Sequence, residues 1–313
     1  MGTLYLDRKQ SELRHRGDCL LLYANGVCLQ RIPLRLLERV VIYGELTLHS
    51  STLGLLAEAG IGVSLINGRF GRRHAQLADG VKNDARRRLA QYRAVTDPRQ
   101  KADIARCILQ RKLQAQQRML QRAAQRRPDL RHPLRKAIGE LAPLRERLTD
   151  PQPLTTQRGI EGAAAAAYFR AYGTLFPAGL GFTGRKRRPP PDPVNACLSL
   201  AYTITHGNAL QALQGAGLDP ALGFLHEIDF GRDSLAADIV EPLRAPIDAW
   251  VWGLFRQRLL RADHFKQKHG GCLLGKEGRK TFYWHFEYLA QGHRRWLRRF
   301  VYALVGRLMQ ETR

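Results

Sequence analysis

The chain has 313 residues, 44% of them hydrophobic, and a formal net charge of +24, because 51 Lys and Arg outnumber 27 Asp and Glu. This length can bury one or two cores, and so large an excess of positive charge is typical of a protein that binds a polyanion, nucleic acid first. The five cysteines form no CxxC pair and no run approaches the ~18 apolar residues of a membrane span. We therefore expect a soluble, cytoplasmic protein without disulfides, a zinc finger or membrane contact.

The first 80 residues are predicted to be rich in strands. Asn25-Gly26 and Asn67-Gly68 are strong hairpin signals, because both residue types tolerate a positive φ. A short helix is expected over residues 52–59, with Gly60 ending it. Apolar or β-branched runs predict strands over residues 19–23, 27–31, 39–43, 62–66 and 70–77.

After residue 80 the chain becomes basic and helical. Residues 82–136 contain 17 Lys or Arg and only four Asp, and apolar residues recur at helical spacing. The predicted fold class is therefore α+β. We expect a small β-rich N-terminal domain over residues 1–80, followed by a larger, basic, all-α catalytic domain over residues 81–313.

Residues 155–170, TTQRGIEGAAAAAYFR, predict a helix that carries Glu161 close to its start. Thr155 or Thr156 is expected to cap this helix. A glutamate beside a row of alanines can approach another backbone closely, which favours a functional site. For this segment alone, the stronger alternative is a glutamate that stands there because the positive end of the helix dipole favours it.

Residues 217–244 contain His226 and then a predicted helix on which Asp238 and Glu241 share one face. Two carboxylates at this spacing repel each other unless a positive charge lies between them. Acidic residues are scarce in this chain, and a carboxylate near DNA repels phosphate unless a bound metal reverses the local charge. Carboxylates with one imidazole suit Mg²⁺ or Mn²⁺ better than structural zinc. A solvated acidic pair with a satisfied histidine is the alternative for this segment alone.

Residues 182–196, FTGRKRRPPPDPVNA, form a basic loop that three prolines stiffen. Asp192 and Pro193 predict the start of a helix, with Asp192 as its N-cap. Stiffness lowers the entropy that a loop loses when it orders on phosphates; a flexible basic run is the alternative. In this loop and in residues 217–244 we predict DNA contacts for Arg185, Lys186, Arg187, Arg188, Arg232 and Arg244.

Taken together, these segments resemble the CRISPR-associated adaptation integrases, the first of the CRISPR-associated proteins. The matching stretches are GIEG with Tyr168-Phe169, GRKRRPPPDPVNA, GLDPALGFLH and GRDSLAADIVEPLR, in the family's order and with its spacing. Four long motifs over nearly the whole chain make the resemblance specific. One departure is visible: the family often continues with Glu-Phe-Arg-Pro, whereas Glu241 is followed here by PLRAP.

The resemblance implies a catalytic centre in which Glu161, His226 and Glu241 hold Mg²⁺ or Mn²⁺, with Asp238 touching the metal directly or through water. It implies that a DNA 3′-hydroxyl attacks a phosphodiester, so that short pieces of double-stranded DNA enter a repeat array during CRISPR adaptation, an antiviral defence. Endonuclease cleavage of branched DNA is implied as the reverse reaction. The resemblance also implies a homodimer, joined through the β-rich domain, and a small second CRISPR-associated protein as a partner.

Two other functions remain open at this point. A metal-dependent nuclease that repairs branched DNA would use the same residues and never integrate. A non-catalytic nucleic-acid-binding protein would bind DNA in a salt-sensitive way, would need no metal, and would be indifferent to the change Glu161→Ala.

Overall fold

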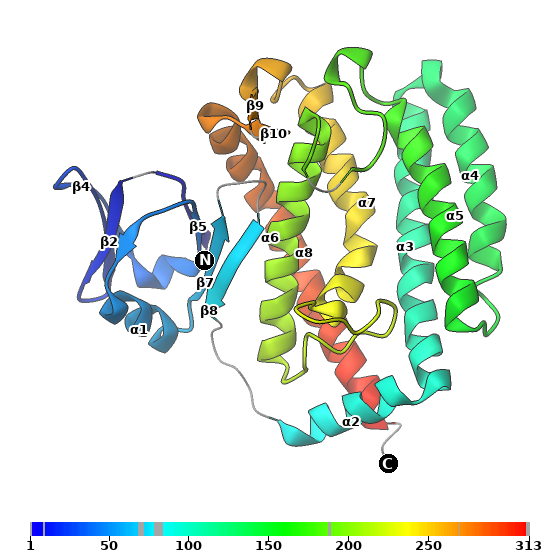
Figure 1. The fold of residues 1–313 in the computed structure, drawn as a ribbon, viewed down its shortest axis with the longest axis horizontal. Coiled ribbons are helices and arrows are strands. Elements are labelled where there is room, and N and C mark those ends of the chain that lie inside the picture. Colours follow the sequence, from blue (N-terminus) through cyan, green and yellow to red (C-terminus); the bar gives the residue numbers. More distant parts are fainter. Residues whose placement is uncertain are drawn as a thin grey trace.

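A computed structural model gives the fold and describes residues 2–8, 10–67, 72–77, 84–186, 189–268 and 270–310. The strands are β1 (Gly2–Leu6), β2 (Ser11–Arg16), β3 (Cys19–Ala24), β4 (Val27–Pro33), β5 (Leu37–Tyr43), β6 (Thr47–Leu48), β7 (Gly62–Asn67), β8 (Arg72–Leu77), β9 (Phe265–Lys268) and β10 (Gly271–Leu274). The helices are α1 (Ser50–Glu58), α2 (Ala85–Thr96), α3 (Pro98–Arg126), α4 (Arg131–Glu146), α5 (Leu154–Gly173), α6 (Pro193–Gly215), α7 (Ser234–Arg256) and α8 (Lys276–Gln310). Figure 1 shows a strand-rich part beside a larger helical part.

The strand-rich part contains two four-stranded sheets, with strand orders β1-β5-β7-β8 and β4-β3-β2-β6. Apolar side chains such as Leu20, Val40 and Leu56 fill a core of their own between these strands and α1. The hairpin predicted at Asn25-Gly26 is confirmed, since both residues have positive φ angles, 50° and 77°. The Asn67-Gly68 turn lies partly outside the described residues, although β7 and β8 do pair in antiparallel fashion.

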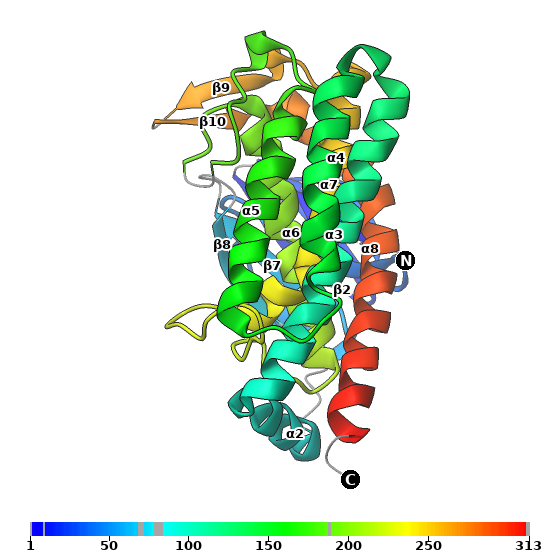
Figure 2. The same cartoon turned by 90° about the vertical axis from the view of Figure 1, so that its right-hand side faces the viewer.

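The helical part is organised around α7, which packs between α3 and α6 (Figure 1). Leu235, Ile239 and Leu243 of α7 are buried, as the helical spacing predicts. Helices α4 and α5 cover the side of α3, and the long helix α8 reaches down to the end of the helical part that also holds α2 (Figure 2). The predicted cap of α5 is wrong: the helix begins at Leu154, directly after Pro153, so the two threonines lie inside it.

The α+β fold class is confirmed, and β1, β2, β6, β9 and β10 are strands that the sequence did not predict. Strands β9 and β10 form an antiparallel hairpin inside the part expected to be all-α. Their sequences, FKQK and GCLL, are too short to show a two-residue alternation. The predicted boundary at residue 80 lies outside the described residues, so the division into domains 1–80 and 81–313, and a dimerisation role for the first, stay predictions.

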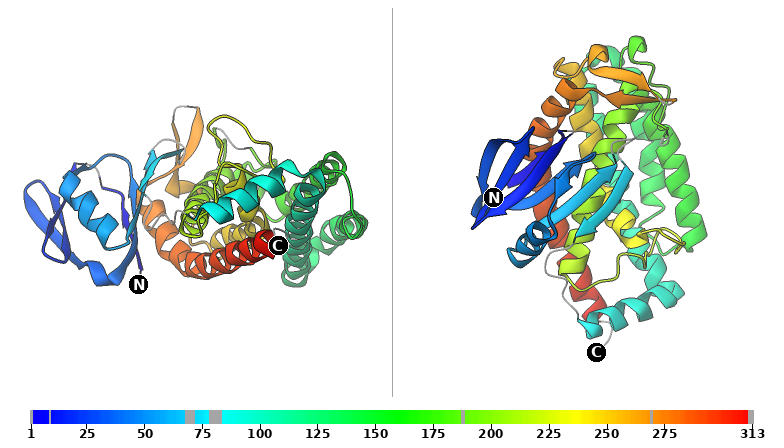
Figure 3. Two further views of the ribbon diagram at one scale, coloured as in Figure 1. Left: turned by 90° about the horizontal axis from the view of Figure 1, so that it is seen from below. Right: turned by 60° about the vertical axis from the view of Figure 1, so that its left-hand side comes forward.

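The strand-rich part contacts the helical part mainly through α6 and α8 (Figure 3). Tyr5 of β1 stacks on Tyr283 of α8, with ring centroids 4.6 Å apart, and its hydroxyl donates to Glu287 at 3.1 Å. Asp7 pairs with Arg279 of α8 at 2.5 Å. Within the described ranges, no helix is both long and apolar enough to cross a membrane.

Candidate active site

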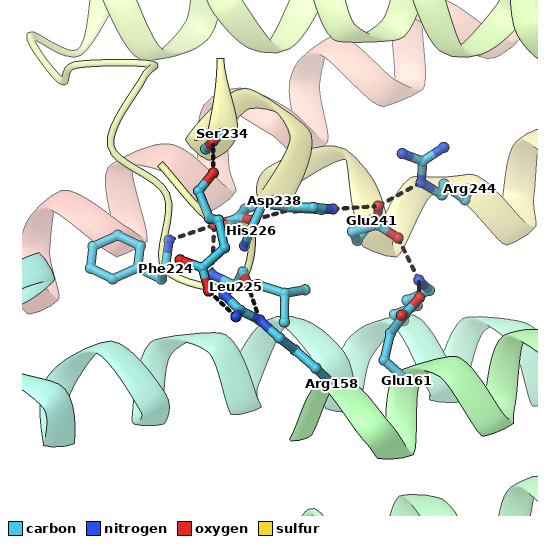
Figure 4. A network of polar contacts seen from close by, with 11 residues as sticks. Arg158, Glu161, Phe224, Leu225, His226, Ser234, Asp238, Glu241 and Arg244 are labelled. Carbon is cyan, nitrogen blue, oxygen red and sulfur yellow. Dashed lines mark hydrogen bonds and ion pairs between the residues drawn. The ribbon is translucent and has the colours of Figure 1, made fainter. Parts of the chain in front are cut away.

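Glu161, His226 and Glu241 come together from three segments that lie far apart in the sequence (Figure 4). Glu161 is on α5, Glu241 is on α7, and His226 is in the loop that precedes α7. The Nε2 atom of His226 lies 3.9 Å from Oε1 of Glu241. Lys112 of α3 joins the two carboxylates: its Nζ is 2.5 Å from Oε1 of Glu161 and 2.6 Å from Oε2 of Glu241. The structure thus brings the two carboxylates together on one lysine and places His226 beside Glu241.

Lys112 was not predicted, although the sequence holds a signal for it. Helix α3 buries Ile108 and Leu109, and Lys112 stands on the same face with only 7% of its surface exposed. A lysine on a buried helical face requires an acidic partner, because an unpaired buried ammonium is strongly destabilising. Its partners, Glu161 and Glu241, belong to other helices, so only the tertiary structure identifies them.

Asp238 holds the loop of His226 in place. Its side chain is fully buried, and Oδ2 accepts hydrogen bonds from the backbone N–H groups of Phe224 (2.6 Å) and Leu225 (2.9 Å). Oδ1 accepts from the backbone N–H of His226 (3.0 Å) and lies 2.6 Å from the ring Nδ1. Nδ1–H of the neutral ring therefore donates to Asp238, which leaves the lone pair of Nε2 on the side of Glu241. A carboxylate in this position fixes the tautomer and orientation of a metal-binding histidine.

Gly223 packs so closely against the start of α7 that no side chain fits there. A Cβ atom on it would lie 2.7 Å from Cβ of Ser234 and 3.0 Å from Oδ2 of Asp238. We expect Gly223→Ala to lower the free energy of unfolding by about 1–3 kcal/mol, as measured by urea denaturation. Gly253→Ala is the control, since a Cβ at this α7 position meets nothing within 4 Å. Equal stability of the two variants would contradict the close packing at Gly223.

Glu241 is buried, with 3% of its side chain exposed, among three basic groups. Nε of Arg244 donates to Oε1 at 2.7 Å. Burial alone would raise the pKa of this carboxyl, but the nearby positive charges, those of Arg244 and Lys112 first among them, hold the pKa of Glu241 well below its usual range. The alternative of a solvated acidic pair is wrong, because Asp238 and Glu241 are both buried and both bonded.

The donor atoms fit a hard divalent cation in their chemistry. Among the described residues, the ammonium of Lys112 is the group recorded against the buried Oε2 of Glu241, at 2.6 Å. Carboxylate oxygens and an imidazole nitrogen with a free lone pair are ligands that Mg²⁺ and Mn²⁺ accept. In the part of the chain that the structure describes, no three His, Cys, Asp or Glu side chains are already grouped closely enough to hold a metal ion. Lys112 occupies the space between Glu161 and Glu241 that a shared metal ion would need.

A second buried aspartate, Asp248, accepts hydrogen bonds from two tyrosines next to this centre. The hydroxyl of Tyr168 donates to Oδ2 of Asp248 at 2.8 Å, and the hydroxyl of Tyr202 donates to Oδ1. The guanidinium of Arg244 lies over the ring of Tyr202, 4.6 Å from its centroid. Asp248 therefore orients the ring of Tyr202, against which Arg244, the hydrogen-bond partner of Glu241, is packed.

Asp248 should make the stability of the protein depend on pH. Burial raises the pKa of Asp248 to about 6, although hydrogen bonds from Tyr202 and Tyr168 oppose the shift. A carboxyl with a higher pKa in the folded than in the unfolded state adds stability as the pH falls through the folded pKa. Between about pH 7 and pH 4, the free energy of unfolding of the wild type, minus that of Asp248→Asn, should rise by roughly 3 kcal/mol. Urea unfolding across this range measures it, and a constant difference would refute it.

Arg185, the first of the four consecutive basic residues in the predicted loop, points inward. Its guanidinium donates to the side chains of Asn195 (2.9 Å) and Ser199 (3.1 Å), and lies 5.3 Å from the centroid of the Tyr202 ring. The predicted N-cap of α6 is confirmed, since Asp192 accepts from the backbone N–H of Asn195 at 2.8 Å. Arg185 therefore anchors the loop to α6, beside the ring of Tyr202 that Arg244 also contacts.

The other predicted DNA contacts are placed differently. Lys186 is exposed and Arg232 is half-buried, while Arg244 is engaged with Glu241. Arg187 and Arg188 lie outside the described residues. Contact with DNA stays a prediction for all six residues, and the geometry favours Lys186 as an accessible one.

The comparisons with known proteins agree with the motifs. The family model described as CRISPR associated protein Cas1 matches residues 4–288. A protein of Thermodesulfovibrio yellowstonii named CRISPR-associated endonuclease Cas1 1 is 35% identical over 99% of this chain and 98% of its own length.

Two solved structures share the fold. A casposase bound to integration product gives a TM-score of 0.83 at 21% identity, covering 98% of this chain and 91% of the other. A chain of a Cas6-RT-Cas1–Cas2 complex gives a TM-score of 0.83 at 22% identity, covering 99% of this chain and 35% of the other. At these identities the structures establish the fold alone. The family assignment comes from the match over residues 4–288 and from the full-length relative: this chain belongs to the Cas1 family of CRISPR-associated proteins.

Proposed function

We propose that this protein is a metal-dependent DNA endonuclease and integrase of CRISPR adaptation, which inserts short DNA segments into a repeat array. The observation that carries the proposal is the meeting of Glu161, His226 and Glu241 from two helices and a loop. Membership of a family whose relatives are named endonucleases supports it. The net charge of +24 supports a DNA substrate, because binding to phosphates releases counterions.

The proposed reaction is transesterification, in which a DNA 3′-hydroxyl attacks a phosphodiester of the target and displaces another 3′-hydroxyl. Bound Mg²⁺ or Mn²⁺ supplies polarisation of the phosphoryl oxygen and stabilises charge on the attacking and leaving oxygens. Glu161, His226 and Glu241 are the residues that would hold it. Asp238 engages Nδ1 of His226 and so orients the ring with Nε2 directed to the site, and Arg244 keeps Glu241 in place.

The basic surface has the task of bringing two DNA molecules into line. Positioning alone can supply a large share of a rate enhancement when two reactants must meet. The proposed phosphate contacts are Lys186, Arg187 and Arg188 of the loop 182–196, together with Arg232. Arg185 and Arg244 would act mainly by ordering the loop and the site, since both stack on Tyr202.

The proposal includes partners. The solved complex that contains a chain of this fold together with Cas2 supports a small second CRISPR-associated protein as the partner. We include a homodimer joined through residues 1–80, and action on double-stranded DNA in the cytoplasm, as parts of the same proposal.

Strand transfer is the experiment that tests it. The protein, with its small partner, is incubated with a labelled duplex bearing 3′-hydroxyls, a supercoiled plasmid carrying the repeat, and Mn²⁺ or Mg²⁺. Label joined to the plasmid, and lost on addition of a chelator, is the expected result. Metal-dependent cutting of branched DNA without joining would replace the proposal with a repair nuclease. DNA binding with neither activity would replace it with a binding protein.

A further inference from the structure

Lys112 stands where a divalent cation shared by Glu161 and Glu241 would have to stand. Its Nζ lies 2.5 Å and 2.6 Å from the two carboxylates, and metal–oxygen distances for Mg²⁺ are only about 2.0–2.1 Å. One position between these oxygens therefore admits either the ammonium or the metal ion. We propose that Lys112 is a tethered counter-cation that competes with the metal for Glu161 and Glu241 and leaves them for a phosphate of the DNA. This inference rests on the metal-dependent function proposed above.

The need for such a counter-cation follows from the burial of Glu241. Its side chain is 3% exposed, and Lys112 is the group recorded against Oε2 among the described residues, so Lys112 supplies the positive charge that this buried oxygen needs. Arg244 donates to the other oxygen, Oε1, at 2.7 Å. When a doubly charged ion enters, an ammonium kept a few ångströms away in a weakly screened site would repel it strongly. Metal binding must therefore include the displacement of Lys112.

The displaced ammonium needs another anion. Glu161 and Glu241 are the carboxylates found within ion-pair distance of Lys112 among the described residues. Glu161 is also the more open of the two, with 32% of its side chain exposed, so the path out of the site leads past it. A DNA substrate brings phosphates to this opening. Metal and DNA should then assist each other's binding by the same factor, because coupling between two ligands is reciprocal.

The probe for the competition is Mn²⁺ alone, titrated into the full-length protein and followed by calorimetry. Lys112→Gln removes the competing charge and should bind Mn²⁺ about tenfold more tightly than the wild type. Lys112→Arg puts a guanidinium that can bind carboxylates through two hydrogen bonds in the same place, and should bind Mn²⁺ more weakly than the wild type. Lys136→Gln, at an exposed lysine of α4, is the matched control for net charge and should leave the affinity unchanged.

The coupling to DNA is measured by repeating the titration with a saturating 3′-hydroxyl duplex. In the wild type the duplex should raise the affinity for Mn²⁺ about fivefold or more, and in Lys112→Gln it should raise it less than about twofold. An equal gain in both proteins, or an affinity of Lys112→Gln equal to or below that of the wild type, would overturn the proposal.

Two controls separate this inference from the proposed function. Suppose that the wild type binds Mn²⁺, that Glu161→Ala does not, and that Lys112→Gln binds it no more tightly than the wild type. The metal site is then supported and the competition by Lys112 is refuted. If no variant binds Mn²⁺ at all, both fail. Should Lys112→Gln not fold, Lys112→Arg decides alone, since it keeps the charge: an affinity for Mn²⁺ equal to or above the wild type would overturn the competition.

Discussion

Glu161→Ala is expected to lower the rate of strand transfer by on the order of 1,000-fold or more, which corresponds to about 4 kcal/mol of transition-state stabilisation. Glu161 contributes one of the two carboxylates that flank Lys112, so the variant would hold the metal with one carboxylate and one imidazole. Without added metal, binding of the duplex should be unchanged or slightly tighter, since a negative charge near the phosphates is removed. Single-turnover strand transfer, beside a gel-shift titration, measures both quantities.

The fold should tolerate the same change. Lys112 keeps its pairing with Glu241, and Glu161 is one-third exposed, so the free energy of unfolding should change by less than about 1 kcal/mol. Glu140→Ala is the matched control, because Glu140 is a helical glutamate paired with an exposed Arg170. It should keep full activity. Unimpaired strand transfer in Glu161→Ala would remove Glu161 from the centre.

Asp238→Asn is expected to reduce strand transfer about 10- to 100-fold through His226, although an asparagine has almost the same shape. An amide has only one oxygen, and Asp238 uses two, one for Phe224 and Leu225 and the other for His226. If the amide nitrogen faces His226, Nδ1 must accept a hydrogen bond. The proton then moves to Nε2, which can no longer bind a metal.

The same variant should lose stability. In one orientation of the asparagine, its amide nitrogen faces the backbone N–H groups of Phe224 and Leu225; in the other, it faces His226. Either way, a buried N–H group loses its hydrogen-bond acceptor. A loss of about 2–4 kcal/mol is expected in urea unfolding. Asp229→Asn is the control in the same loop, because Asp229 is exposed and the recorded hydrogen bond of its side chain is to the backbone N–H of its neighbour Phe230. An active, fully stable Asp238→Asn protein would show that Asp238 does not orient His226.

The sequence by itself determined the elements whose signals are local. Asn25-Gly26 predicts its hairpin because both residues accept the left-handed backbone that the turn requires. Asp192-Pro193 predicts the start of α6, since an N-cap and a proline act within one helical turn. The motifs around Glu161, His226 and Glu241 led to the Cas1 family, which the family model and the curated relative confirm.

Only the tertiary structure decided how these residues work together. Lys112 gained its partners through the packing of α3 against α5 and α7, and Arg185 and Arg244 came to share the ring of Tyr202 through the packing of α6 against α7. The burial of Glu241 likewise depends on helices that its own segment does not contain. Helical periodicity specifies which face of a helix is buried, but the partner that meets a buried charge is specified by contacts between residues far apart in the chain.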